Sequence, residues 1–234
     1  MTIKIYLSVL FTWVTVWFAV AQTPNDSLRL AFNIKWNDQE VALQKKYVSE
    51  HDSLEITTFK FYVSSIRIQF DDNSTYIQKN SFHLIDIEKR SSLIIPVCIA
   101  ANKNVQKVTF CIGVDSLASV SGALAGDLDA TNGMYWAWQS GFINVKIEGK
   151  SNSCKTRKNQ FQFHIGGYLK PNFALRKIQL DSKIIKNIDN TLKITCNAAN
   201  FFNKIDLATN NAVMIPGEKA MKMADLVSKI FYLE

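Results

Sequence analysis

The longest β-type segment of the chain runs from Leu54 to Phe70, with the sequence LEITTFKFYVSSIRIQF. It is rich in β-branched and aromatic residues, which favour strands. Successive side chains of a strand point to opposite faces, and the apolar residues of this segment change parity at Ser64 and Ser65. A bulge redirects the side chains that follow it, so we predict one long strand with a bulge at these serines.

Shorter segments of the same kind lie on both sides of this strand, and turn-type residues separate them. They are residues 28–36, 76–78, 81–88, 93–100, 105–114, 143–147, 160–167, 174–180 and 191–197. Helical spacing is confined to 200–207 and 216–234, with a short helix expected near 118–124 inside the polar loop 115–132. The pattern predicts an all-β fold, an antiparallel β-sandwich with a long loop before the Trp-x-Trp strand and a short C-terminal helix.

The first 21 residues differ from the rest of the chain. Lys4 is their one charge, an apolar run follows from Ile5 to Val20, and Ala19-Val20-Ala21 is a small-x-small motif. We predict a secretory signal peptide cleaved after Ala21, rather than the alternative of an uncleaved membrane anchor. The mature chain, residues 22–234, is then a single periplasmic or secreted domain with no transmembrane segment.

Removal of Lys4 changes the formal charge from +7 to +6, a moderately basic value. No basic helix or aromatic-basic motif indicates a nucleic-acid partner. The chain contains four cysteines, namely Cys98, Cys111, Cys154 and Cys196. An even number in an exported chain predicts two disulfides with three connectivities open. A hairpin centred at Asn104 and Val105 would place Cys98 opposite Cys111, and two separate buried thiols are the alternative.

Residues 133–141, with the sequence GMYWAWQSG, contain two tryptophans two positions apart. In a strand, Met134, Trp136 and Trp138 would share one face. Such a stripe suits ordinary core, because tryptophans bury large apolar areas. Thioethers and indoles are also soft groups that suit the surroundings of copper, so the residues leave both interpretations open.

The chain has no nucleophile elbow, P-loop, Rossmann glycine motif or HExxH motif, so we predict that it is not an enzyme. A hydrolase with unlocated catalytic residues is a weaker alternative. Among its three histidines, His83 and His164 lie in strand-like segments beside aromatic residues. Imidazole is a common copper ligand, although a histidine on a strand is more often structural.

Five segments together resemble the MbnP family of secreted copper-binding proteins, which is named after a member associated with methanobactin operons. They are residues 61–68 (FYVSSIRI), 82–87 (FHLIDI), 112–115 (IGVD), 133–142 (GMYWAWQSGF) and 163–167 (FHIGG). The resemblance implies a β-sandwich. It also implies copper held by histidines and by a kynurenine that a di-haem peroxidase-like partner makes from a tryptophan.

Carried over to this chain, the resemblance makes His164 the first expected ligand and His83 a further one. It makes Trp136 the first candidate for the modified residue and Trp138 the second. Met134 and Gln162 are candidate supporting residues. The ligating relatives have a histidine two residues after the modified tryptophan, where this chain has Trp138.

The spacing between the two parts of this site depends on strand register. If Glu148 lies opposite Gln160, His164 lies opposite Asn144 and about 20 Å from Trp138 along the strand. Contact needs a different register or a bend at Ser140 and Gly141. The rival function is a β-sandwich recognition module that binds a peptide, glycan or surface protein without metal. His164→Ala separates the two functions, because copper loss without unfolding identifies a ligand.

Overall fold

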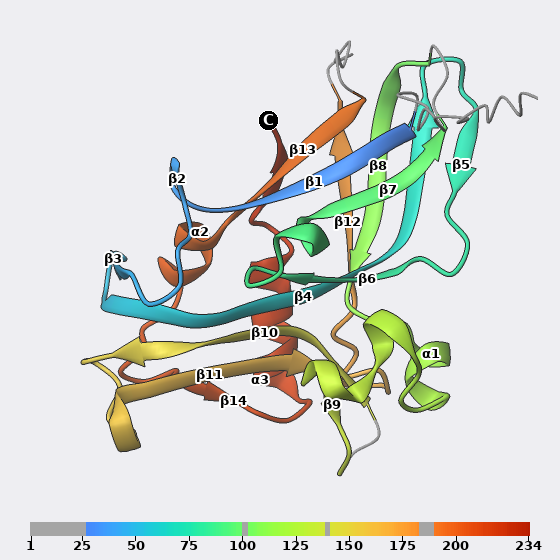
Figure 1. Cartoon of the computed structure of the whole chain (residues 1–234). Coiled ribbons are helices and arrows are strands. Elements are labelled where there is room, and N and C mark those ends of the chain that lie inside the picture. The colour runs from blue at the N-terminus through green and yellow to red at the C-terminus, as the bar shows by residue number, and fades with distance from the viewer. Residues whose placement is uncertain (1–26, 100–102, 139–140, 183–189) are drawn as a thin grey trace, which may run out of the picture.

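The predicted long strand is β4, which covers Ser53–Phe70 and is central to the larger of two sheets (Figure 1). This computed structural model describes residues 27–99, 103–138, 141–182 and 190–234, and the predicted signal peptide lies outside them. The predicted bulge is confirmed. The register of β4 with its neighbour shifts between Ser64 and Arg67, and Ser65 has a φ of 54°. Residues 59, 61 and 63 are buried before the bulge, and 66, 68 and 70 after it.

The larger sheet places β4 between strands from distant parts of the chain. Its order is β12 (Arg176–Asp181), β8 (Val105–Ile112), β4, β10 (Gly141–Ser151), β11 (Gln160–Gly166) and β14 (Ala212–Val213). Four short strands pair beside this path, with β3 (Lys46–Val48), β5 (Thr75–Ile77) and β6 (Phe82–Asp86) on β4 and β9 (Tyr135–Trp136) on β10.

The smaller sheet is built on the N-terminal strand β1. Its order is β15 (Phe231–Leu233), β13 (Thr191–Asn197), β1 (Ser27–Trp36) and β2 (Gln39–Glu40), with β7 (Ile94–Ile99) also paired to β1. The pairs β1–β13 and β11–β14 are parallel. The all-β prediction is therefore confirmed, but the sheets are mixed rather than wholly antiparallel.

The predicted hairpin of residues 93–114 is wrong. β7 pairs with β1, where Cys98 lies opposite Leu28, whereas β8 pairs with β4, where Cys111 lies opposite Ser64. The two cysteines belong to different sheets, because the chain crosses from one sheet to the other between these strands. All four cysteines are free thiols in the structure, so the expected disulfides are not present.

The main core lies between the two sheets. Phe32 of β1 and Phe231 of β15 meet Phe61 of β4 and Phe110 of β8, with ring centroids 5.6–5.9 Å apart and steep interplanar angles. Edge-to-face packing of this kind suits aromatic rings. The four rings therefore join the smaller sheet to the larger one.

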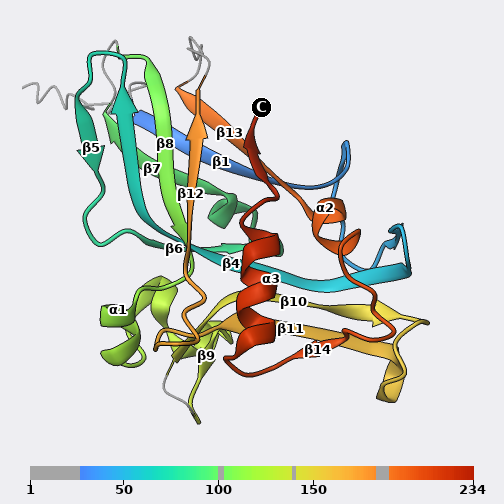
Figure 2. The ribbon, with the colours of Figure 1, turned by 180° about the vertical axis from the view of Figure 1, so that it is seen from behind.

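The helices are short. They are α1 (Ser116–Val120), α2 (Ala198–Phe202) and α3 (Glu218–Val227), and the 3-10 turns are η1 (Arg90–Leu93), η2 (Gly126–Leu128), η3 (Ala130–Asn132) and η4 (Arg157–Asn159). Figure 2 shows α3 crossing in front of β10 and β11, and its buried residues, among them Ala220 and Met223, join the main core. The predicted C-terminal helix is thus confirmed over Glu218–Val227, but the chain continues into β15, which pairs with β13. Among the described residues, no helix has the length and apolarity needed to cross a bilayer.

A second, smaller core lies on the outer face of the larger sheet, under the loop that carries α1, η2 and η3. Its members are Tyr62, Leu84, Val114, Ala118, Leu128, Met134, Trp136, Phe142 and Ile143. Tyr62 donates a hydrogen bond to the Asp127 carbonyl oxygen at 2.9 Å, and the Asp127 carboxylate accepts one from the Leu84 N–H at 3.0 Å. These bonds fix the predicted long loop to β4 and β6, and so position the tryptophan segment.

Candidate functional site

The tryptophan segment folds back along the strand that follows it. β9 pairs antiparallel with the start of β10, with Trp136 opposite Gly141 and Tyr135 opposite Phe142. The chain therefore reverses between Trp136 and Gly141. The bend expected at Ser140 lies outside the described residues.

This reversal brings Trp136 onto strand β11. A Cβ added at Gly166 would lie 2.8 Å from Cζ3 and 3.0 Å from Cη2 of Trp136, so the indole rests directly on this glycine. His164 is two residues from Gly166 in β11, and residues two apart in a strand share a face. The register also differs from the expected one, because His164 lies opposite Lys146 rather than Asn144. Along the strand, His164 and Gly166 are roughly 7 Å apart.

The two indoles form a buried and exposed pair. Trp136 is 6% exposed, Trp138 is 64% exposed, and their ring centroids are 5.9 Å apart. Met134 is fully buried in the same small core as Trp136, as the expected stripe requires. Trp138 leaves the stripe for the surface. Because β9 ends at Trp136, the pleat no longer determines where Trp138 points.

His164 is a nearly buried histidine, 8% exposed, that is hydrogen-bonded to a carboxylate. Its Nε2 lies 2.6 Å from Oε1 of Glu148. The hydrogen bond from His164 is the main cause that lowers the pKa of Glu148 below its usual range, with Lys146 and Thr58 adding to it. An ionised carboxylate only accepts hydrogen bonds, so Nε2 is the donor in this contact.

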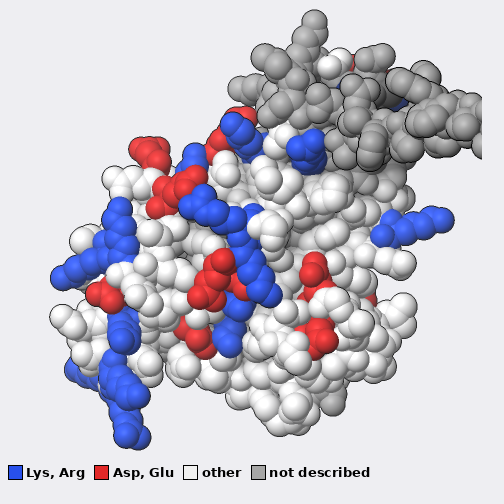
Figure 3. Space-filling model, viewed as in Figure 1, with Lys and Arg blue, Asp and Glu red and all other residues white. Residues whose placement is uncertain are grey.

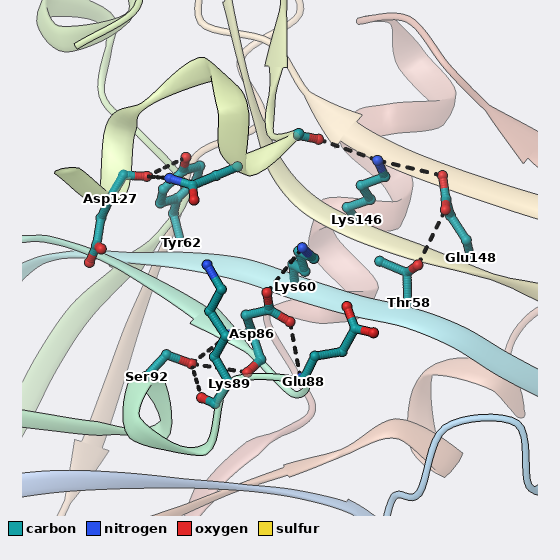
Figure 4. Close-up of polar contacts among 12 residues, drawn as sticks. Thr58, Lys60, Tyr62, Asp86, Glu88, Lys89, Ser92, Asp127, Lys146 and Glu148 are labelled. Carbon is teal, nitrogen blue, oxygen red and sulfur yellow. Dashed lines mark hydrogen bonds and ion pairs between the residues drawn. The ribbon is translucent and has the colours of Figure 1, made fainter. Parts of the chain in front are cut away.

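Glu148 belongs to a charged region on the outer face of the larger sheet (Figure 4). It accepts a hydrogen bond from Thr58 at 3.3 Å, and Lys146 lies 3.7 Å away. Lys146 also donates to the Gly133 carbonyl oxygen at 3.3 Å, which ties this region to the tryptophan loop.

The strand register explains why these charges meet. Asp86 of β6 lies opposite Lys60 of β4, Lys60 opposite Lys146 of β10, and Lys146 opposite His164 of β11. Lys60 and Asp86 form an ion pair at 3.0 Å. Sequence reasoning missed Glu148 and Lys146. Their alternation with Val145 and Ile147 indicated an outward face, but the partner strand that makes them neighbours of His164 is not encoded in that spacing.

The structure does not bring His83 to His164. His83 lies on β6 opposite Val63, on the same face as Ile85 of the main core, whereas His164 occupies the outer face of its strand. The Nε2 of His83 lies 2.8 Å from the Gln78 amide oxygen, and burial lowers its pKa. Gln162 is closer to the site, because it lies opposite Glu148 in the β10–β11 register.

A pocket of about 230 Å³ opens beside Trp136. It is lined by Trp136, Phe142, Gly167, Tyr168, Leu169, Lys170, Asn172 and Pro216. Gly167 has a φ of 137°, and a Cβ there would lie 2.2 Å from the Asn172 carbonyl oxygen. A glycine is therefore required for the loop after β11 to close around this pocket.

The side chains present determine what this site could hold. Within the described ranges, no group of three or more His, Cys, Asp or Glu side chains is placed to hold a metal ion. The His164 imidazole, on the face of β11 that also carries Gly166, is hydrogen-bonded to the Glu148 carboxylate. A metal at this position would need a further donor other than a His, Cys, Asp or Glu side chain.

The comparisons with known proteins agree with the fold. A search of curated proteins finds no match. The solved structure of MbnP from Methylosinus trichosporium superposes with a TM-score of 0.57 at 14% sequence identity, over 78% of this chain and 79% of that one. The MbnP family model matches residues 25–215, which include both tryptophans and both strand histidines. The chain belongs to the MbnP family.

Proposed function

We propose that this protein is a periplasmic or secreted copper-binding protein and not an enzyme. We further propose that a di-haem peroxidase-like partner, with two equivalents of hydrogen peroxide as oxidant, oxidises Trp136 to kynurenine. The indole C2–C3 bond breaks as two oxygen atoms are added, and hydrolysis of the resulting N-formylkynurenine releases the lost carbon as formate. The observation that carries the proposal is the position of Trp136 on Gly166, on the face of β11 that also carries His164. A tryptophan distant from an available imidazole would have no use as a precursor of a ligand.

The residues present fit copper if the tryptophan is modified. His164 offers Nδ1, and Glu148 holds the other ring nitrogen, an arrangement often found behind metal-binding histidines. Kynurenine has an aromatic amine and a ketone, which are donors that indole lacks. We expect the bound copper to catalyse no reaction. The role of the protein is to capture the metal in a site that the small core shields from water.

Trp136 is the better candidate for the modified residue. It is buried against Gly166 of β11, whereas Trp138 is largely exposed. Trp138 contacts Trp136 and reaches the solvent, so it can pass an electron from the buried indole to an oxidant outside. In this proposal Trp136 is the indole that is modified, and Trp138 is the indole that transfers the electron.

His83 is not part of the proposed site, because it lies on the opposite face of the sheet. It is therefore a matched control for His164, being a partly buried strand histidine whose Nε2 is also hydrogen-bonded. Trp36 is the matching control for Trp136, because it is a buried tryptophan that stacks on Tyr47 in the main core.

The test is the intact mass and copper content of the exported protein, produced with and without a di-haem peroxidase-like protein from the same organism. We expect one copper per chain and a tryptophan that has lost one carbon and gained one oxygen, mapped to Trp136. His164→Ala and Trp136→Phe should lose copper while His83→Ala and Trp36→Phe retain it. An unmodified chain that takes up no Cu(I) would favour the recognition module instead.

A further inference from the structure

Exposed apolar side chains concentrate at the end of the molecule that carries the paired indoles. Six of them define what we name the apolar rim, namely Leu117, Val120, Trp138, Leu169, Phe173 and Ile215. They come from four segments that meet around the pocket beside Trp136. A contiguous exposed apolar surface usually marks a site of interaction.

Contacts between these segments hold the rim together. Ser116, at the start of α1, donates a hydrogen bond to the Tyr168 carbonyl oxygen at 2.8 Å. Leu169 lines the pocket with Trp136, and the Cβ of Pro216, which follows Ile215, lies 3.2 Å from the position that a Cβ on Gly167 would take. The rim is thus one surface formed by α1, the residues after β9, the loop after β11 and the residues after β14.

This end of the molecule is also poor in charge. Figure 3 shows the surface around α1 and β9 as mostly uncharged, whereas lysines and acids cover the face of the strands beside it. Among the described residues that line the pocket, Lys170 is the one with a charged side chain. A partner that complements this surface is therefore uncharged over most of its own contact area, since a buried unpaired charge is costly.

We infer that the apolar rim is the docking surface for the protein that removes electrons from the indole pair. This rests on the proposed function. An electron acceptor must approach Trp138, the exposed member of the pair, and Trp138 lies within the rim. Docking there is driven by apolar contact, with the exposed indole as the main contact residue, because tryptophans often dominate the energetics of interfaces.

The inference is tested with two exposed rim residues and two matched controls. Leu117 and Ile215 are 81% and 60% exposed, and Val48 of β3 and Ile77 of β5 are 71% and 55% exposed on strands away from the rim. Each is changed to glutamate, which adds a charge at a position where the fold loses little. Circular dichroism and thermal unfolding check that all four variants are folded.

The measurement is the rate at which the di-haem peroxidase-like protein and hydrogen peroxide convert the tryptophan, followed by intact mass. We expect Leu117→Glu and Ile215→Glu to slow conversion at least tenfold, about the loss that one charge buried at an interface causes, and the two controls to match the wild type. Raising the salt concentration should change the wild-type conversion rate little. Salt screens interactions between exposed charges, and docking through the rim depends on apolar contacts instead.

Three outcomes overturn the inference. Wild-type rates in both rim variants place the docking surface elsewhere and leave the proposed function intact. Binding of the wild type to phosphatidylcholine and phosphatidylglycerol vesicles that Leu117→Glu abolishes, together with unchanged conversion, assigns the rim to a lipid surface. A wild-type chain that the haem protein binds but never modifies overturns the proposed function and this inference with it.

Discussion

Glu148 is the hydrogen-bond partner of His164. Its carboxylate contacts the imidazole, the Thr58 hydroxyl and the Lys146 ammonium group on the outer face of the sheet. An ionised carboxylate accepts hydrogen bonds only, so it favours a proton on Nε2. A lone histidine in a strand gives no hint of this, because the carboxylate comes from a neighbouring strand sixteen residues away in sequence.

We predict that Glu148→Ala lowers the free energy of unfolding by about 1–3 kcal/mol, because it leaves a buried ring nitrogen without its acceptor. Glu148→Gln retains an acceptor oxygen and should lose less. Urea unfolding measures the stability, and ¹⁵N-edited NMR of the imidazole reports the tautomer. Retention of the Nε2-protonated tautomer in Glu148→Ala would show that the carboxylate does not select it.

A second prediction concerns the glycine beneath Trp136. Gly166→Ala places a methyl group 2.6 Å from the Phe142 carbonyl oxygen and 2.8 Å from the indole, so the strand and the ring must separate. We expect a loss of about 1–3 kcal/mol in stability and a shift of tryptophan fluorescence towards that of an exposed indole. Gly217→Ala is the control, since a Cβ there meets nothing within 4 Å. Equal effects of the two substitutions would contradict the packing described for Trp136.

At the scale of elements, residue alternation predicted strands better than it predicted their partners. The parity change at Ser64 and Ser65 identified the bulge in β4, because burial on one face leaves a readable pattern. The same reasoning failed for β7 and β8, which look like a hairpin but belong to different sheets. Alternation shows that one face is buried, and it does not show which neighbour provides the hydrogen bonds.

The C-terminal strand supplies a pH-dependent contact between elements. Glu234, next to β15, accepts hydrogen bonds from Lys35 and Asn33 of β1 and from Thr195 of β13. The Lys35 ammonium group, followed by Thr195, lowers the pKa of Glu234 from its ordinary 4.5 to about 2. A carboxyl group whose pKa is lowered by folding stabilises the fold at pH values above its pKa in the unfolded chain. That contribution is lost as the pH falls towards 2.

We therefore expect Glu234→Gln to destabilise the protein by about 1 kcal/mol at pH 7, a figure reduced for solvent screening of a partly exposed group. The difference from the wild type should shrink between pH 4.5 and 2 as Glu234 is protonated. Urea unfolding across this range measures it. Glu218→Gln is the control, because the Glu218–Lys222 pair is largely exposed and should contribute nothing measurable. A stability difference that persists unchanged at pH 2 would contradict this assignment.

At the scale of the whole molecule, the sequence predicted the fold class. It also named two residues of the candidate site, His164 and Trp136, but not Glu148 or Lys146. Trp136 packs on Gly166 of β11, the face of the strand that also carries His164, because one strand reversal and one register place it there. His83 does not join them, since its strand presents it to the other side of the sheet. The rim could not be foreseen either, because its residues come from four segments that the sequence keeps far apart.

The absence of the expected disulfides leads to a prediction about the four cysteines. Cys154 and Cys196 are buried, Cys98 and Cys111 are half-buried, and burial raises the pKa of all four thiols. We expect alkylation of the non-reduced, unfolded protein to label four thiols, and the folded protein to react first at Cys98 and Cys111. A mass two hydrogens below that of the reduced chain would reveal a disulfide and contradict the free thiols.

The division of the apolar interior into a large core and a small one has a consequence for how the protein fluctuates. The small core rests on the outer face of β4 under the loop, and the amides of that loop can exchange with solvent through local opening while the sheets stay closed. β4 bonds to strands along both of its edges, and its amides should be the slowest to exchange. Trp136, the proposed site of modification, lies under this loop, where local opening can uncover it without global unfolding.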